Sequence, residues 1–180
     1  MDKTSISLLT FILFLSAVYD LRTYRIPNLL TYSSMFIGIL YNIALKGVDG
    51  FFFSFGGIGV GIGILITFYF IGVMGAGDVK LLGVVGSFLG VKGVIGSFIF
   101  TGIAGGLYSI ILIMVFRNKF RGVFSNLYYS GVNLILTRKF EGFGSNDTDN
   151  RPRLCYGLAI AAGTWIYMFC KSLNIEILPI

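Results

Sequence analysis

The chain has 180 residues, of which 56% are hydrophobic and only 12% are charged. Its mean hydropathy is +0.86, which excludes an ordinary water-soluble domain and makes lipid the expected surroundings. The net charge of +6 fits basic loops beside anionic lipid better than a nucleic-acid surface, because no basic cluster is interleaved with stacking aromatic residues.

Apolar runs long enough to cross about 30 Å of hydrocarbon recur along the whole chain. They occupy roughly residues 4–19, 29–45, 52–74, 79–91, 94–116 and 154–171. The runs lack the alternation of a barrel strand, so we expect an all-α polytopic bundle of six transmembrane helices in a single domain, residues 1–180. The first run lacks a basic segment beyond Lys3 and leads straight into a charged turn, so we interpret it as a retained helix rather than a signal peptide.

The basic residues favour one orientation of these six helices. With the N-terminus outside, ten of the Lys and Arg residues fall on the cytoplasmic side and four on the outer side, as the positive-inside rule requires. The cytoplasmic set is Arg22, Arg25, Lys80, Arg117, Lys119, Arg121, Arg138, Lys139, Arg151 and Arg153, and the outer set is Lys3, Lys46, Lys92 and Lys171. The long cytoplasmic loop 117–153 has helix-spaced apolar residues, which predict an amphipathic helix at about 120–136 lying in the membrane interface.

Glycines spaced by four residues predict close helix packing, a role in the scaffold rather than in chemistry. These pairs are Gly57 and Gly61, Gly59 and Gly63, Gly86 and Gly90, and Gly102 and Gly106. The chain has no histidine, which excludes Ser-His and Cys-His catalysis and most zinc sites. Cys155 and Cys170 lie on one predicted helix about 22 Å apart, too far to form a disulfide with each other.

Two of the eight acidic residues fall at the membrane boundary on the same predicted face. Asp20 closes the first helix, and Asp78 stands at the end of the third helix or the start of the fourth. Each alone could be a helix cap or a boundary charge answered by Arg22 or Lys80. The occurrence of both on one face favours a functional site.

Two neighbouring carboxyl groups cannot both ionise readily, so one holds a proton while the other stays charged. The charged group can take a proton from a water that attacks a peptide carbonyl, and the protonated group can donate to the carbonyl oxygen and then to the leaving amine. Gly75 and Gly77 would let the backbone bend and an extended substrate lie close to Asp78. Lys80 would bias the titration of the pair or simply anchor the helix at the cytoplasmic boundary.

At these residues the chain resembles a known family of membrane proteases. The segment "GAGDVKLL" (75–82) is similar to the Gly-x-Gly-Asp motif of the type IV prepilin peptidases. The segment "YDLRTYRIPNLLT" (19–31) resembles their partner motif, in which Pro27 and Asn28 open the second helix. The segment "RPRLCYGLAIAAGT" (151–164) looks like the last helix of the short prepilin peptidases of Tad-type (Flp) pilus systems, although three residues separate Pro152 from Tyr156.

The resemblance implies a membrane-embedded aspartic endopeptidase with Asp20 and Asp78 as the catalytic pair. Its substrates would be prepilins or pseudopilins, cut on the cytoplasmic side of the cell membrane between a short leader and a hydrophobic helix. Longer members add a cytosolic methyltransferase region with zinc-binding cysteines before the first helix. Because the first predicted helix here begins at about residue 4, we expect no such region. The expected activity is that of a peptidase without N-methylation, and with no metal or cofactor.

Other readings stay open. Archaeal preflagellin peptidases are close relatives of the family, whereas presenilin-like enzymes carry a Pro-Ala-Leu motif that this sequence lacks. From a different class, a small transporter or assembly factor could use the aspartates as a proton or cation site. A transporter usually places its carboxylates near the midplane and often has inverted repeats, and neither feature is evident here.

Overall fold

The computed structural model describes residues 3–23, 25–71, 74–115 and 155–173, and all secondary structure within these ranges is helical. The helices are α1 (Lys3–Thr23), α2 (Asn28–Lys46), α3 (Val48–Phe70), α4 (Ala76–Val115) and α6 (Tyr156–Ser172). The chain divides into one compact unit of Met1–Gly106 with Cys155–Ile180 and a second of Leu107–Leu154. The predicted interfacial helix at about 120–136, with the rest of loop 117–153, lies outside the described residues.

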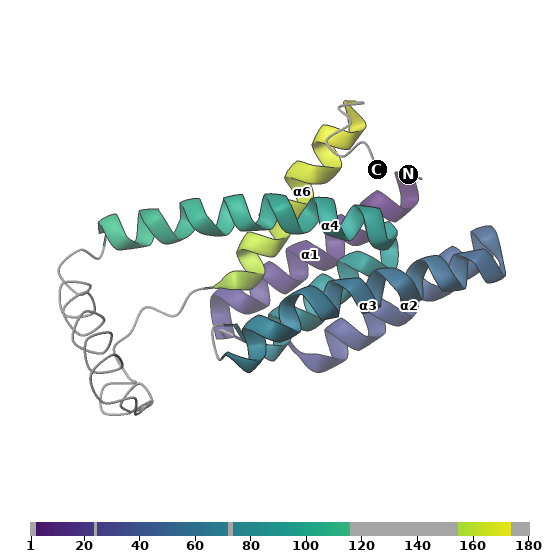
Figure 1. Cartoon of the computed structure of the whole chain (residues 1–180), viewed down its shortest axis with the longest axis horizontal. Helices are drawn as coiled ribbons and strands as arrows, with labels where there is room; N and C mark the ends of the chain where they lie inside the picture. Colours follow the sequence, from purple (N-terminus) through teal and green to yellow (C-terminus); the bar gives the residue numbers. More distant parts are fainter. Residues whose placement is uncertain (1–2, 24, 72–73, 116–154, 174–180) are drawn as a thin grey trace, which may run out of the picture. The chain divides into compact units, whose positions relative to one another are not determined.

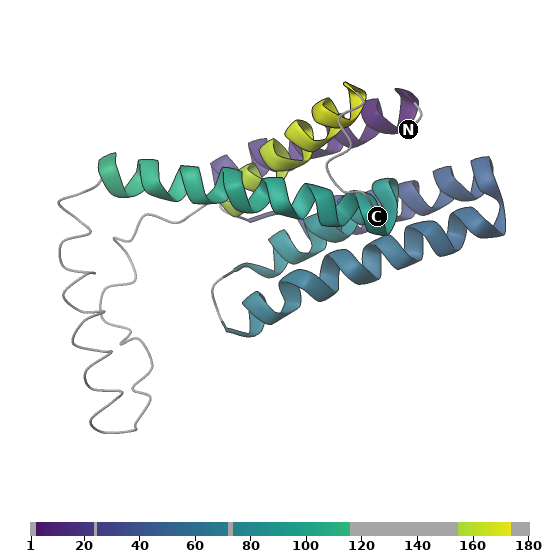
Figure 2. The same ribbon diagram turned by 45° about the horizontal axis from the view of Figure 1, so that its top comes forward.

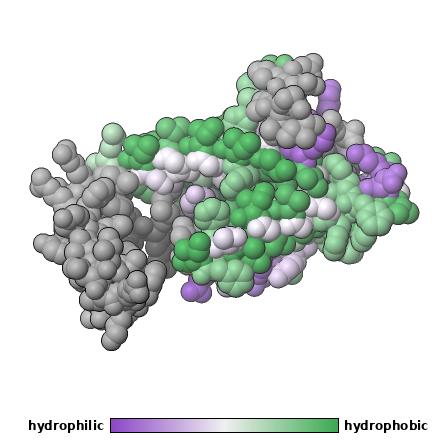
Figure 3. All heavy atoms as spheres, viewed as in Figure 1, coloured by the Kyte–Doolittle hydropathy of each residue, from purple (hydrophilic) through white to green (hydrophobic). Residues whose placement is uncertain are grey.

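Four of these helices are long and apolar enough to cross a membrane: α1, α2, α3 and the Ala76–Leu112 part of α4. On the face drawn in Figure 3, hydrophobic residues cover most of the described surface, and hydrophilic residues gather near helix ends. A helix that is apolar on all sides belongs in a bundle or in lipid. The protein is therefore a multi-pass membrane protein, and the count of six spans stays a prediction.

The first part of α4 is the central helix of the main unit. Every residue from Leu81 to Gly90 is buried, and Leu81, Leu82, Val84 and Val85 are fully enclosed. Around it α2 lies beside α3, and α1 lies beside α6 (Figures 1 and 2). This packing fixes the start of α4, where Asp78 lies, against the neighbouring helices.

The helix α4 is broken at Gly90, which has φ 68° and ψ −174° inside otherwise helical chain. The predicted spans 79–91 and 94–116 fall on the two sides of this residue. The break therefore lies close to where the sequence predicted a connection, but it is a kink at one glycine rather than a loop. Phe53 of α3 fills the space beside Gly90, where a Cβ atom would collide with its ring, and only glycine adopts such a positive φ without strain.

At the kink, the backbone carbonyl group of Ser87 accepts hydrogen bonds from side chains of two neighbouring helices. In a regular helix the Ser87 C=O would accept from the N–H of residue 91. Here Asn42 Nδ2 of α2 donates to Ser87 O at 3.0 Å, and Ser54 Oγ of α3 donates to the same oxygen at 2.8 Å. Asn42 and Ser54 are both buried. Their side chains thus replace the backbone partner that the kink removes, as is required inside a membrane.

Close backbone approach between α3 and α4 explains part of the glycine pattern. A Cβ atom on Gly57 would collide with the backbone of Gly86, and one on Gly86 with the backbone of Gly57. Gly61 similarly faces the carbonyl of Leu82. The packing role predicted for Gly57, Gly61, Gly86 and Gly90 is confirmed. It is wrong for Gly59, Gly63, Gly102 and Gly106, which have no described neighbour within 4 Å of an added Cβ.

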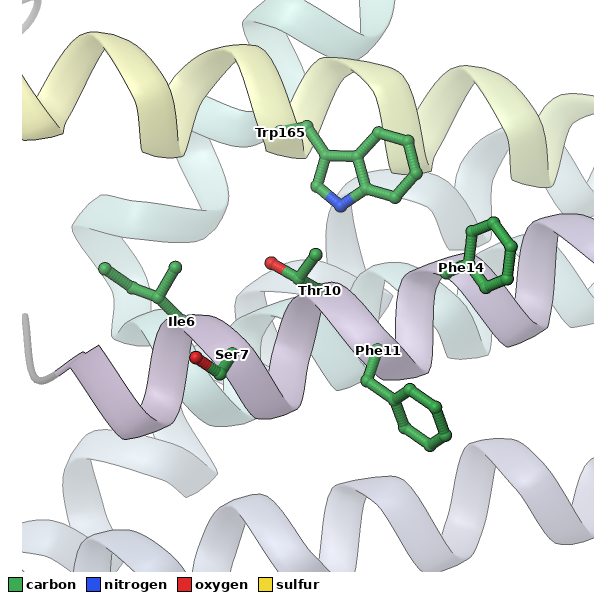
Figure 4. A pocket seen from close by; sticks show the side chains of 6 residues that line it. All are labelled: Ile6, Ser7, Thr10, Phe11, Phe14 and Trp165. Carbon is green, nitrogen blue, oxygen red and sulfur yellow. The ribbon is translucent and has the colours of Figure 1, made fainter.

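A groove of about 640 Å³ lies between α1 and α6. In Figure 4, Trp165 of α6 extends toward Thr10 of α1, while Phe11 and Phe14 line the α1 side. Ile6 and Ser7 complete the lining. None of these residues belongs to the site predicted from the sequence, so the groove is a feature of the membrane-embedded surface rather than of that site.

The shared carbonyl of Ser87 predicts a non-additive pair of substitutions. Asn42→Leu and Ser54→Ala should each lower the free energy of unfolding by about 0.5–1 kcal/mol, because the other donor still satisfies the oxygen. The double variant should lose about 1–3 kcal/mol more than the sum, since the carbonyl is then buried without a partner. Thermal unfolding of the purified protein in detergent measures both effects. Strict additivity would show that the two donors do not share this function.

The α3–α4 contact predicts a sharp contrast between two glycines. Gly86→Ala should destabilise the protein by about 1–3 kcal/mol, because the new methyl group meets the backbone of Gly57. Gly59→Ala is the matched control, since its methyl group enters open space, and it should leave the unfolding temperature unchanged or raise it. Equal unfolding temperatures for the two variants would contradict the close approach.

Candidate functional site

Asp20 lies in the last turn of α1, three residues before the helix ends at Thr23. The chain turns back at once: Thr23 Oγ1 lies 2.8 Å from Tyr19 O and 2.9 Å from Arg25 O. Although it is charged and close to a helix end, Asp20 is only 6% exposed. A buried carboxylate needs partners within the protein, and the start of another helix supplies them.

That helix is α6. The Gly157 N–H donates to Asp20 Oδ2 at 2.9 Å. The Cys155 thiol donates to the Asp20 carbonyl oxygen at 3.9 Å. The first N–H groups of a helix have no partner within it and favour negative charge. The Asp20 side chain therefore joins the end of α1 to the beginning of α6.

Asp78 lies in the first turn of α4 and is held by its own helix. Its Oδ2 accepts from the Gly75 N–H at 3.2 Å, and its N–H donates to Gly75 O at 3.1 Å. The side-chain bond is one half of a capping box, in which the third residue of a helix bonds back to the N–H of the residue before the helix. The other half is absent because Gly75 has no side chain, and its backbone carbonyl accepts from the Asp78 N–H instead. Asp78 is only partly buried, and Gly75 and Ala76 beside it are exposed, so its carboxyl group is reachable from the end of the bundle.

Ile26, in the short connection before α2, lies between the two helix starts. A Cβ atom on Gly77 would be 3.2 Å from Ile26 Cβ, and one on Gly157 would be 3.1 Å from Ile26 Cδ1. Ile26 is 8% exposed. Its side chain therefore packs against the first turns of both α4 and α6 and keeps them adjacent.

This packing brings Asp20 and Asp78 to one end of the same bundle, although 58 positions separate them in the sequence. Asp78 is carried by the first turn of α4, Asp20 is bonded to the first turn of α6, and Ile26 contacts both of these turns. Two carboxyl groups in such proximity can divide the roles of proton acceptor and proton donor. Among the described residues, no group of three or more His, Cys, Asp or Glu side chains could hold a metal ion.

The basic and polar residues predicted to support the site have different positions. Lys80 Nζ donates to Asn28 Oδ1 at 2.8 Å and lies 4.9 Å from the centre of the Tyr32 ring, so it ties the start of α4 to the start of α2. Pro27 precedes α2, and its carbonyl accepts from the N–H groups of residues 30 and 31 at 3.1 and 3.3 Å. Arg22 is exposed in the last turn of α1.

The two glycines of the Gly-x-Gly-Asp segment differ in their surroundings, and their predicted role in bending the backbone for a substrate stays a prediction. Neither has a positive φ; among the described residues only Gly47 and Gly90 do. At Gly77 an added Cβ would meet Ile26 Cβ at 3.2 Å, a tight contact that a small shift of Ile26 would have to relieve. At Gly75 an added Cβ would make an ordinary contact of 3.4 Å with Asp78 Oδ2. Gly75 therefore contributes through its backbone, whose N–H and C=O groups both bond to Asp78.

The sequence reasoning missed Ile26 and Gly157 as site residues. Both act through contacts between segments far apart in the chain, which spacing along one helix does not reveal. One feature could have drawn attention to Gly157. It is the second residue of the last helix, and the residue before that helix, Cys155, makes no cap hydrogen bond with its side chain. A helix start without its own cap requires a partner from elsewhere.

Comparison with known proteins places this bundle in a family. The model of the type IV leader peptidase family matches residues 7–110, a range that includes Asp20 and Asp78 but ends before Gly157. No curated protein and no solved structure was found to match the chain. Because the family match covers more than half of the 180 residues, the chain belongs to the type IV leader peptidase family, a family of proteases.

Proposed function

We propose that this protein is a membrane-embedded aspartic endopeptidase that removes the leader peptide of type IV or Flp-type prepilins, with Asp20 and Asp78 as its catalytic pair. The observation that carries the proposal is geometric: Ile26 packs against both the start of α4, which carries Asp78, and the start of α6, which donates a hydrogen bond to Asp20. Membership of the family supports peptide hydrolysis in general. The position of both aspartates at helix ends supports cleavage at the membrane surface rather than at its midplane.

The reaction needs no group beyond the two carboxyls and a water. The ionised carboxyl takes a proton from water as the water oxygen bonds to the scissile carbonyl carbon. The protonated carboxyl gives its proton to the carbonyl oxygen, which forms a tetrahedral intermediate. When the C–N bond breaks, the leaving nitrogen takes the proton that the first carboxyl had received, and a hydroxyl of the intermediate returns its proton to the second carboxyl as the C=O bond of the product acid forms. The pair then returns to its starting state with one proton between the two groups.

The cytoplasmic side is the proposed location of this chemistry. Arg22 and Arg25 follow Asp20, and Lys80 follows Asp78, which by the positive-inside rule favours the cytoplasm for this end of the bundle. Exposed Gly75 and Ala76 leave room there for an extended segment to approach Asp78. A leader that ends where a hydrophobic helix begins would present its scissile bond at this depth.

Substitution of either aspartate tests the proposal directly. In cells that also express a candidate prepilin, Asp20→Asn and Asp78→Asn should each slow leader removal by about 100- to 10,000-fold, the usual contribution of a general acid or base. Gel shift and mass spectrometry of the prepilin measure the rate. The matched control is Asp49→Asn, in the exposed first turn of α3, which should cleave normally. Normal cleavage by either Asp20 or Asp78 variant would overturn the assignment.

Lys80 should affect stability more than chemistry. Because its ammonium group bonds to Asn28, Lys80→Met should lower the free energy of unfolding by about 1–2 kcal/mol, while slowing cleavage less than tenfold. Asn28→Ala should have a similar effect, and the double variant should cost little more than either single one. A cleavage defect in Lys80→Met as large as that of Asp78→Asn would show that Lys80 acts on the carboxyl pair itself.

A further inference from the structure

Asp20 performs for α6 the task that a capping side chain ordinarily performs for its own helix. The residue before α6 is Cys155, and its side chain makes no cap hydrogen bond. In its place, Asp20 Oδ2 from the end of α1 accepts from the N–H of Gly157 at 2.9 Å. The carboxyl oxygen and the second residue of α6 are thus in direct contact, 137 positions apart in the sequence.

This contact is possible only because residue 157 has no side chain. A Cβ atom there would lie 2.8 Å from Asp20 Oδ2, 3.2 Å from Asp20 Cγ and 3.1 Å from Ile26 Cδ1. The first distance is shorter than real Cβ contacts allow, and its partner is the carboxyl group itself. Any larger residue must therefore displace the Asp20 side chain or move the start of α6 away from it.

We infer that Gly157 is a positioning residue for catalysis: its backbone N–H and the space left by its missing side chain hold the Asp20 carboxyl group in one orientation. With Oδ2 engaged by α6, rotation of the carboxyl group about its Cβ–Cγ bond is restricted, which fixes where its other oxygen meets water or the substrate. This inference rests on the proposed function. It adds α6, which lies beyond the range matched by the family model, to the two helices that carry the aspartates.

Kinetics of Gly157→Ala provide the first test. Displacement of a reacting group by about 1 Å can cost about 100-fold in rate, so kcat should fall on that scale. KM should stay within about twofold of the wild type, because Gly157 is proposed to act on the carboxyl group and not on the substrate. Gly59→Ala, whose methyl group meets nothing within 4 Å, should match the wild type in both constants. A rise in KM with an unchanged kcat would overturn the inference.

A second substitution separates the two groups that an alanine at position 157 would meet. Ile26→Val removes the Cδ1 atom and with it one close contact, but it leaves Asp20 Oδ2 in place. If Asp20 is the group displaced, the double variant Gly157→Ala/Ile26→Val should stay as slow as Gly157→Ala. Recovery of the wild-type rate would show that packing against Ile26 caused the defect, and the inference would be wrong.

A measurement without substrate separates this inference from the proposed function. Gly157→Ala should lower the unfolding temperature of the detergent-solubilised protein, and it should lower it clearly less in an Asp20→Ala background, where no carboxyl group is displaced. Equal shifts in the two backgrounds would overturn the contact between Gly157 and Asp20. If the shifts differ as expected but the wild-type protein cleaves no prepilin, the proposed function fails while the positioning contact stands.

Discussion

Inside a membrane an unpaired backbone N–H or C=O group costs several kcal/mol, so a helix break within this bundle needs a partner from the chain itself. At the break of α4, Asn42 and Ser54 supply that partner to the Ser87 carbonyl. At the starts of α4 and α6, Asp78 and Asp20 supply it to backbone N–H groups. Both aspartates thus bond to the first backbone N–H groups of a helix, Asp78 within its own helix and Asp20 from the end of α1, and Ile26 packs against both of these helix starts.

Glycines allow close packing both between the helices of the scaffold and beside the two aspartates. Between α3 and α4, glycines let two backbones touch, which packs the central helix tightly where no hydrophobic effect acts between helices. Near the aspartates, Gly77 and Gly157 make room for the single side chain of Ile26. One isoleucine therefore couples the first turns of two helices, and the distance between the carboxyl groups depends on its packing.

The sequence predicted correctly the features that depend on a local pattern of residues. The apolar runs placed α1, α2, α3 and α6 to within a few residues, and two charges in an apolar chain marked Asp20 and Asp78 as the residues to examine. The break between the two predicted spans is made by the conformation of one residue, Gly90, and not by a loop, which hydropathy does not report. The roles of Ile26 and Gly157 depend on contacts between helices that are far apart in the sequence. At Gly75 there is room for a side chain, and this residue takes part in the helix start through its backbone N–H and C=O groups.

The contact between Asp20 and Gly157 joins the first described helix to the last. During synthesis, both aspartates are made long before α6, yet until α6 is inserted the Asp20 carboxyl group lacks the N–H group that holds it. An unfinished chain in the membrane therefore contains both acidic residues without the arrangement that makes them a pair. The order of the helices along the chain delays this hydrogen bond until translation has reached α6.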